Sequence, residues 1–326
     1  MRVGVDTFTI GALGLDPFQT LDFLVERSFE GAQFGYIRGL SPSLDRGELA
    51  EIRHYADKLG LYTHVSISSP NPHHLKDVSR EGLLDDIRKQ IEAAASAGWH
   101  ELHSAIGSLP ERFGHQIPWQ EHLSESTAVI RDLAPVLRAN GSRINLETHG
   151  DATTFELVRL SESVGPDVSG ICLDTANVLL FGESPIEAVR RAAPYTHLTH
   201  AKDAILYFGD NGLVRQGRPP GEGNLDWDAI LPILAEYSPG LPLSIEDHKW
   251  IFECPIFDRS WYAAMPDLQC EEVGELVRLA WLTQQKILSG GIPDPEQYES
   301  IPFIDQLEDR LRIGRDHLKA AVDRLS

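Results

Sequence analysis

The hydrophobic pattern of this chain alternates between two periods. Short β-branched and apolar runs, such as residues 2–8 and 241–248, are followed by longer segments with apolar positions at helical spacing, such as 80–98 and 120–141. Alternation at period two indicates strands, and recurrence every three to four residues indicates amphipathic helices. Because regular strand–helix alternation requires parallel strands joined by helical crossovers, the pattern predicts an α/β protein.

The number of strand–helix units favours a closed barrel. The expected strands lie at 2–8, 31–36, 61–68, 101–107, 143–150, 168–178, 196–206 and 241–248. Eight units fit a (β/α)8 TIM barrel better than an open doubly wound sheet, and no GxGxxG follows the first strand. We therefore predict a single TIM barrel over residues 1–290, with an insertion at 249–268 after strand eight. Residues 291–326 are expected to form a C-terminal helical extension packed on the barrel, and about 286–304 to be irregular.

Composition excludes several classes of partner. The net charge of −20 repels nucleic acid and anionic membrane surfaces, and the chain has no apolar run of about 18 residues that could span a bilayer. The three cysteines, Cys172, Cys254 and Cys270, are few and widely spaced, and the N-terminus lacks the pattern of a signal peptide. These features predict a cytoplasmic protein.

Four metal-ligating residue types stand at equivalent positions on four successive expected strands. Glu147, Asp174, His200 and Glu246 end the runs INLE, ICLD, HLTH and LSIE. In a TIM barrel the carboxyl ends of the strands converge on the active site. Three converging carboxylates would repel one another, and a divalent cation removes that conflict. We expect Mn²⁺ in this oxygen and imidazole set, with Co²⁺, Mg²⁺ and Zn²⁺ as alternatives.

Residues two positions beyond these ligands face the same side of their strands. They are His149, Lys202 and His248. We expect His149 to act as a general acid or base, the alternative being that it orients Glu147. Lys202 is expected to contact a substrate oxygen, or else to form a salt bridge with Asp203.

Other residues are weaker candidates. His64 and His103, on strands three and four, either contact substrate or are ordinary polar packing residues. Asp226 is expected to cap the seventh barrel helix. The aromatic residues of the 249–268 insertion would cover an apolar ligand or pack against another subunit.

The motifs at the expected strand ends resemble those of a known protein family. The motifs ETHG, CLDTAN, HAKD and IEDH at the strand ends are similar to those of the xylose isomerase-like TIM-barrel superfamily, over about residues 1–290. The resemblance implies that Glu147, Asp174, His200 and Glu246 hold the metal. It also implies, from the ketose 3-epimerases, that Glu147 and Glu246 transfer protons.

The chain departs from the ketose epimerases at two points. Asn177 stands where they have a histidine, and AKDAILY follows the metal histidine where they place an arginine. His149, in contrast, matches the base of the metal-dependent 3-dehydroshikimate dehydratases. The aromatic insertion and the HAKDAILYF run look most like the catalytic α subunits of C-glycoside deglycosidases, which associate with a small second subunit. The abasic-site endonucleases of the superfamily need a richer histidine set than this chain offers.

These expectations share one chemistry. A metal-dependent enzyme would remove a proton next to the carbonyl of a sugar-like substrate and form an enediolate. Our leading interpretation is a β-elimination lyase acting on a 3-oxo-glycoside. The alternative is a sugar or sugar-phosphate isomerase or epimerase, and a remoter one is a non-catalytic metal-binding subunit. His149, Glu147 and Glu246 would be catalytic. The residues expected to bind substrate are Lys202, His248, Asn177, His64 and His103. A small second subunit or a homo-oligomer is the expected assembly.

Overall fold

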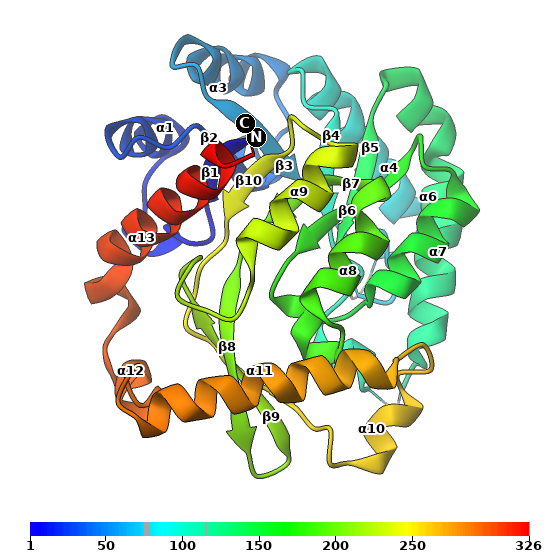
Figure 1. The fold of residues 1–326 in the computed structure, drawn as a ribbon. Coiled ribbons are helices and arrows are strands. Elements are labelled where there is room, and N and C mark those ends of the chain that lie inside the picture. Colours follow the sequence, from blue (N-terminus) through cyan, green and yellow to red (C-terminus); the bar gives the residue numbers. More distant parts are fainter. Residues whose placement is uncertain (75–77, 115, 326) are drawn as a thin grey trace.

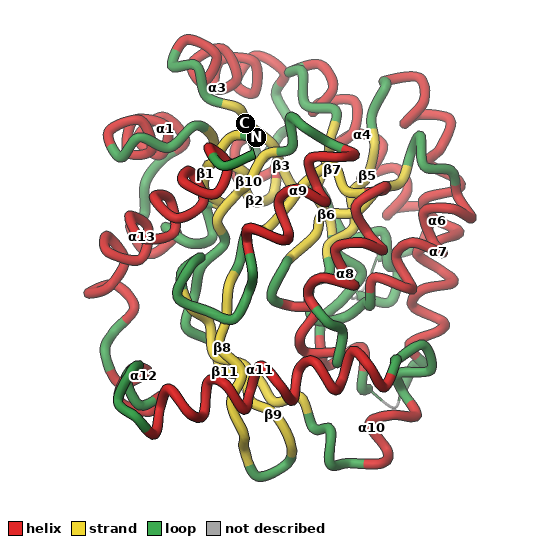
Figure 2. The backbone as a smooth tube through the Cα atoms, in the orientation of Figure 1, coloured by secondary structure: helices red, strands yellow, loops and turns green. Residues whose placement is uncertain are grey.

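The computed structural model describes residues 1–74, 78–114 and 116–325. At its centre is a closed parallel barrel with the strand order β1-β10-β7-β6-β5-β4-β3-β2 (Figures 1 and 2). The barrel strands are β1 (Arg2–Asp6), β2 (Gly31–Tyr36), β3 (Tyr62–Ser66), β4 (Glu101–Ser104), β5 (Arg143–Glu147), β6 (Ser169–Asp174), β7 (Thr196–His200) and β10 (Pro242–Ile245). The predicted TIM barrel is confirmed.

Helices cover the outside of the barrel, so its strands are buried on both faces. β6, with the sequence SGICLD, is buried along its whole length, as expected of a strand covered on two sides. The main outer helices are α1 (Pro17–Glu26), α3 (Arg46–Lys58), α4 (Arg80–Ser96), α6 (Trp119–Asn140), α7 (Thr154–Val164), α8 (Pro185–Ala192), α9 (Trp227–Tyr237) and α13 (Phe303–Asp323). Shorter elements are α2 (Ile37–Leu40), α5 (Leu109–Arg112), α10 (Arg259–Ala263), η1 (Gly11–Leu13), η2 (Asn177–Phe181) and η3 (Ala193–Tyr195).

Side-chain caps fix where several of these helices begin. Asp16 and Thr153 form capping boxes at α1 and α7 and so satisfy backbone N–H groups of the first turn. Asp226 accepts a hydrogen bond from the Ala229 N–H at 3.1 Å, so the predicted cap of α9 is confirmed.

The expected strand over 196–206 is wrong in extent. β7 ends at His200, and the chain turns out of the barrel at Ala201 and Lys202. It then forms an antiparallel hairpin of β8 (Asp203–Gly209) and β9 (Gly212–Arg218), and β11 (Ile251–Cys254) joins β9. Asp203 anchors the turn, because its carboxylate accepts the N–H groups of Ala204, Gly221 and Leu225.

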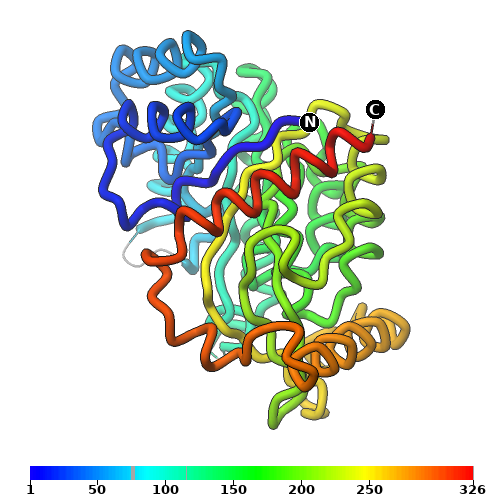
Figure 3. Tube along the Cα trace, turned by 60° about the vertical axis from the view of Figure 1, so that its left-hand side comes forward, coloured from blue at the N-terminus to red at the C-terminus, as the bar shows by residue number. Residues whose placement is uncertain are grey.

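The two long C-terminal helices pack in different places. α11 (Cys270–Leu288) crosses β8 of the hairpin, whereas α13 contacts β1, β10 and α9 (Figure 1). The segment expected to be irregular contains the short helix α12 (Pro295–Ser300). The division into a barrel of 1–290 and an extension of 291–326 stays a prediction. The two chain ends lie close together beside β1 (Figures 1 and 3). Among the described residues, no helix combines the length and apolar character that crossing a bilayer requires.

Candidate metal centre

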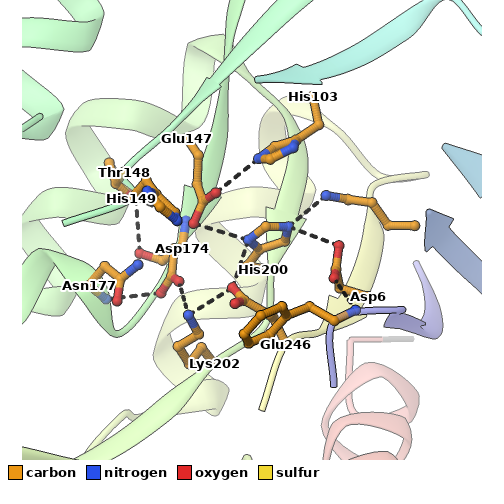
Figure 4. A network of polar contacts seen from close by, with 12 residues as sticks. Asp6, His103, Glu147, Thr148, His149, Asp174, Asn177, His200, Lys202 and Glu246 are labelled. Carbon is orange, nitrogen blue, oxygen red and sulfur yellow. Dashed lines mark hydrogen bonds and ion pairs between the residues drawn. The ribbon is translucent and has the colours of Figure 1, made fainter. Parts of the chain in front are cut away.

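The structure brings together the four predicted ligands. Glu147, Asp174 and His200 are the last residues of β5, β6 and β7, and Glu246 directly follows β10. One nitrogen or carboxylate oxygen from each lies within 4.8 Å of the others (Figure 4). All four side chains are buried.

In each carboxylate of this group one oxygen lacks a hydrogen bond within the described residues, and this tests whether the residues fit a cation. Asp174 Oδ1 accepts the N–H groups of Ala176 and Asn177, both at 2.9 Å, and Glu147 Oε2 lies 2.9 Å from His103 Nε2. The remaining atoms Glu147 Oε1, Asp174 Oδ2, Glu246 Oε2 and His200 Nδ1 are buried without a hydrogen-bond partner among the described residues. Buried polar atoms rarely stay unpaired, so this convergence fits a bound divalent cation.

The imidazole of His200 is held from its other side. Its Nε2 lies 2.6 Å from Gln33 Nε2 and 3.4 Å from Asp6 Oδ2. Gln33 Oε1 is buried and, within the described part of the chain, unpaired. Turning the amide by 180° lets Oε1 accept the His200 Nε2–H. The Nδ1 lone pair then points at the carboxylates and is available for a metal.

The charges of the centre favour ionised glutamates. Burial would raise the pKa of Glu147, but His200 and His149 lower it well below its usual value. Burial would also raise the pKa of Glu246, but Lys202 and His200 lower it well below its usual value. Burial raises the pKa of Asp174 despite the nearby Lys202.

His149 stands beside the centre, as predicted from its spacing to Glu147. Its Nδ1 lies 3.0 Å from the Gly107 carbonyl oxygen, which fixes Nδ1–H as a donor. The second ring nitrogen, Nε2, is therefore the atom that can exchange a proton. The charge of Glu147, opposed by burial, raises the pKa of His149 to about 9.

Lys202 is ion-paired within the centre. Its Nζ lies 2.6 Å from Asp174 Oδ2 and 2.7 Å from Glu246 Oε2, although the geometry is not that of a hydrogen bond. The alternative partner expected for it, Asp203, instead accepts backbone N–H groups and the indole N–H of Trp227. The Lys202–Asp203 salt bridge is therefore wrong.

Two cavities border the centre on either side. Cavity A, of about 300 Å³, is lined by residues that include Asp6, Phe8, Ser66 and His103. Cavity B, of about 200 Å³, is lined by residues that include Asn177, Lys202, His248, Trp250 and Phe252. His149 and Glu246 line both cavities, so they lie where a substrate that occupied either cavity would meet the centre.

Among the expected substrate-binding residues, His64 is displaced from the site. It lines neither cavity, and its ring packs against Tyr62 with centroids 5.6 Å apart. Burial lowers its pKa to about 4. His64 lies two residues before Ser66 on β3, which places it one layer deeper in the barrel than the cavity.

Three residues of the site were missed by the sequence analysis. Asp6 ends β1, so the same strand-end rule that found Asp174 could have found it. Gln33 lies inside β2 and Arg215 lies on β9 of the hairpin. No sequence signal identified Arg215, because the hairpin itself was not predicted.

The fold agrees with a comparison to protein families. The family described as "Xylose isomerase-like TIM barrel" matches residues 21–253, which is more than half of the chain. This chain belongs to the xylose isomerase-like TIM barrel family. The resemblance expected from the motifs is thereby confirmed at the level of the family, whereas the finer likeness to C-glycoside deglycosidases has no specific support.

Two similar proteins are distant relatives in sequence. The uncharacterized protein YihM of Escherichia coli K12 is 22% identical over 218 residues, or 66% of this chain and 61% of that protein. The 3-oxo-isoapionate decarboxylase of Pectobacterium atrosepticum is 22% identical over 204 residues, or 62% of this chain and 66% of that protein. Each match spans less than two thirds of the relative's own length.

Solved structures show the same fold. A D-psicose 3-epimerase from Clostridium cellulolyticum, determined with D-tagatose, gives a TM-score of 0.68 at 15% identity over 99% of both chains. A xylose isomerase-like TIM barrel protein from Mycobacterium smegmatis, in complex with magnesium, gives 0.59 at 16% identity, over 83% of this chain and 97% of that one. At these identities the likeness establishes the fold alone.

Proposed function

We propose that this protein is a metal-dependent enzyme that removes a proton next to the carbonyl of a sugar-like substrate and returns it, as an isomerase or epimerase. The observation that carries the proposal is the set of four buried candidate ligand atoms on adjacent strand ends, none of them hydrogen-bonded within the described residues, with His149 beside them. The epimerase and the decarboxylase among the similar proteins support the carbohydrate substrate class.

In this proposal Glu147, Asp174, His200 and Glu246 hold a divalent cation, with Mn²⁺ as our expected ion. When bound, the cation would stabilise the enediolate oxygens and cancel the Glu147 charge that favours protonated His149. His149 Nε2 removes the α-proton while Gly107 fixes the ring. His149 can return the same proton, whereas epimerisation needs a proton on the other face; Glu246, which lines both cavities, would deliver it after taking a proton from solvent, and Glu147 is the alternative proton carrier. His103, Asn177, Lys202 and His248 orient the substrate.

A second candidate is β-elimination from a 3-oxo-glycoside, which was our leading interpretation of the sequence. It shares the deprotonation step but expels a β-substituent instead of accepting a proton. One observation favours it: cavity B, with Trp250 and Phe252 in its lining, offers room for a leaving group beyond the sugar in cavity A. Phe8 and Trp250, both about half exposed, meet edge to face at 5.5 Å and link the rims of the two cavities. Cytoplasmic location, a small second subunit and a homo-oligomer stay predictions.

Deuterium uptake tests the shared step. The Mn²⁺-loaded protein in D₂O should exchange the α-proton of D-fructose or D-tagatose, whereas exchange confined to a 3-oxo-glucoside, with release of the aglycone, would favour the lyase. His149→Ala should keep its metal and lose exchange by about 100-fold or more, the usual contribution of a general base. The exposed His54→Ala is the matched control. Unchanged exchange in His149→Ala would remove His149 from the base role.

A further inference from the structure

Arg215 is a fully buried arginine whose guanidinium has no hydrogen-bond partner. Its exposed fraction is 0%, and all three of its guanidinium nitrogens are unpaired within the described residues. A guanidinium carries five N–H donors and stays charged, so burying it unpaired is strongly unfavourable. Such a group needs a partner that the described residues do not supply, which is an ordered water, an ion or a ligand.

Two other buried arginines of this protein have carboxylate partners. Arg310 pairs with Asp247 at 2.5 Å, and Arg112 pairs with Glu156 at 2.5 Å. These arginines bridge elements of the fold. Arg215 makes no such pair among the described residues, so bridging does not explain its burial.

The surroundings of Arg215 place its charge against cavity B. On β9 it pairs in register with Phe252 of β11, and its Cζ lies 5.6 Å from the Phe252 ring centroid. Phe252 lines cavity B. The charge of Arg215 also reaches Lys202 and His248, two further residues of that lining.

We propose that Arg215 and Lys202 make cavity B a binding site for an anionic group of the substrate, a carboxylate or a phosphate. Rotation of the Phe252 side chain brings the guanidinium to the cavity, where its paired donors match the two oxygens of such a group. The chain has a net charge of −20, and its acidic candidate ligands would repel an anion. The buried charges of Arg215 and Lys202 offset part of that repulsion. The inference rests on the proposed function, because it names the substrate class of that same site.

Matched neutral and anionic sugars test this binding. Calorimetric titration of the Mn²⁺-loaded protein with D-glucose, D-glucuronate and D-glucose 6-phosphate compares one sugar without a charge, with a carboxylate and with a phosphate. At least one of the two anions should bind at least about tenfold more tightly than glucose. The anion that does so shows whether the site prefers a carboxylate or a phosphate. Arg215→Met should abolish this preference while metal content stays unchanged.

Two further variants keep the test decisive. Arg215→Lys retains the charge but loses the fork of donors, so it should fold and show an intermediate preference. Arg218→Met is the matched control, because Arg218 is a buried arginine of the same strand whose guanidinium stacks on Tyr298 at 3.4 Å. Equal binding of the three sugars by the wild type, or an intact preference in Arg215→Met, would overturn the proposal. An equal loss in Arg218→Met would also overturn it.

Deuterium exchange in the same samples separates the proposed function from the proposal of an anion site. Exchange into a neutral ketose without anion preference would leave the proposed function standing and remove this inference. A preference for the anion without exchange into any substrate would support the anion site and contradict the proposed function.

Discussion

The imidazole of His200 connects the metal centre to the residues beneath it. If Gln33 Oε1 accepts the His200 Nε2–H, the lone pair of Nδ1 is fixed toward Glu147 and Glu246, which lie 3.2 and 2.9 Å away. A hydrogen bond to the far nitrogen of a ligating histidine sets its tautomer and its basicity. We therefore expect Gln33 to contribute to metal binding without contacting the metal.

Removing that acceptor should weaken metal binding. We expect Gln33→Leu to raise the dissociation constant for Mn²⁺ by about 10–100-fold, the usual effect of losing such a partner. Gln33→Glu, which retains an acceptor, should lose much less. Calorimetric titration with Mn²⁺ measures both values, and an unchanged constant in Gln33→Leu would show that Asp6 alone orients the ring.

Glu183 provides a prediction on pH and stability away from the centre. Burial, opposed by a hydrogen bond from Thr154 and the charge of Arg191, raises the pKa of Glu183 from its usual 4.5 to about 7. The folded state thus holds this proton more tightly than the unfolded state does. Its contribution to the free energy of unfolding is complete below pH 4.5 and is lost as the pH rises through about 7.

Glu183→Gln should remove this dependence. Between about pH 5 and pH 8 the wild type should lose up to about 3 kcal/mol relative to the variant, from the size of the pKa shift. Urea unfolding at a series of pH values measures the difference. The exposed Glu187→Gln, in the first turn of the helix α8 that follows Glu183, is the control and should run parallel to the wild type. Parallel curves for Glu183→Gln as well would contradict the raised pKa.

Strand-end chemistry was the part of the site that the sequence could predict. Glu147, Asp174, His200 and Glu246 were found because the carboxyl ends of parallel barrel strands must converge. His64 was misplaced because period two gives the face of a strand but not the depth along it. Gln33 could not be predicted, because its role depends on which ring nitrogen of His200 it meets across the barrel.

At the scale of elements, the hairpin of β8 and β9 lies behind the outer site, because β9 pairs with β11, which carries Phe252 of cavity B. β9 passes close to the chain that follows β10, because Gly217 has no side chain to collide there. A Cβ at this position would overlap the carbonyl oxygen of His248. Gly217 therefore allows the hairpin to carry Arg215 behind cavity B.

Gly217→Ala should displace the hairpin and destabilise the protein by about 1–3 kcal/mol, the range for forced overpacking. Amide hydrogen exchange should rise along residues 203–218 before it rises in the barrel. Gly274→Ala is the matched control, because an added Cβ there meets nothing within 4 Å. Equal exchange rates in Gly217→Ala and wild type would show that the close approach can relax without moving the strand.

The same hairpin marks the limit of prediction from sequence at this scale. The stretch from Thr196 to Leu206 contains no Gly or Pro that would interrupt it, so the sequence predicts a single strand. The break at Ala201 and Lys202 depends on Asp203, whose carboxylate captures N–H groups of residues 204, 221 and 225. Such long-range capture leaves no periodic signal, and the strand–helix alternation elsewhere was enough to predict the barrel.

The whole molecule is strongly acidic, and its acidic candidate ligands lie together at the carboxyl ends of the barrel strands. Glu147, Asp174 and Glu246 are buried within one small volume, where Lys202 and His200 compensate only part of their charge. A cation that binds the folded state alone stabilises it by mass action, by about 2.7 kcal/mol at a concentration one hundred times its dissociation constant. Stability and metal occupancy should therefore change together.

Metal titration followed by thermal unfolding tests this central claim most directly. Chelator-treated protein titrated with Mn²⁺ should bind one ion per chain and gain several degrees in Tm, and Asp174→Asn should lose both effects. An unchanged Tm in the wild type, together with no saturable binding of Mn²⁺, Co²⁺, Mg²⁺ or Zn²⁺, would contradict the metal centre and with it the enolising function.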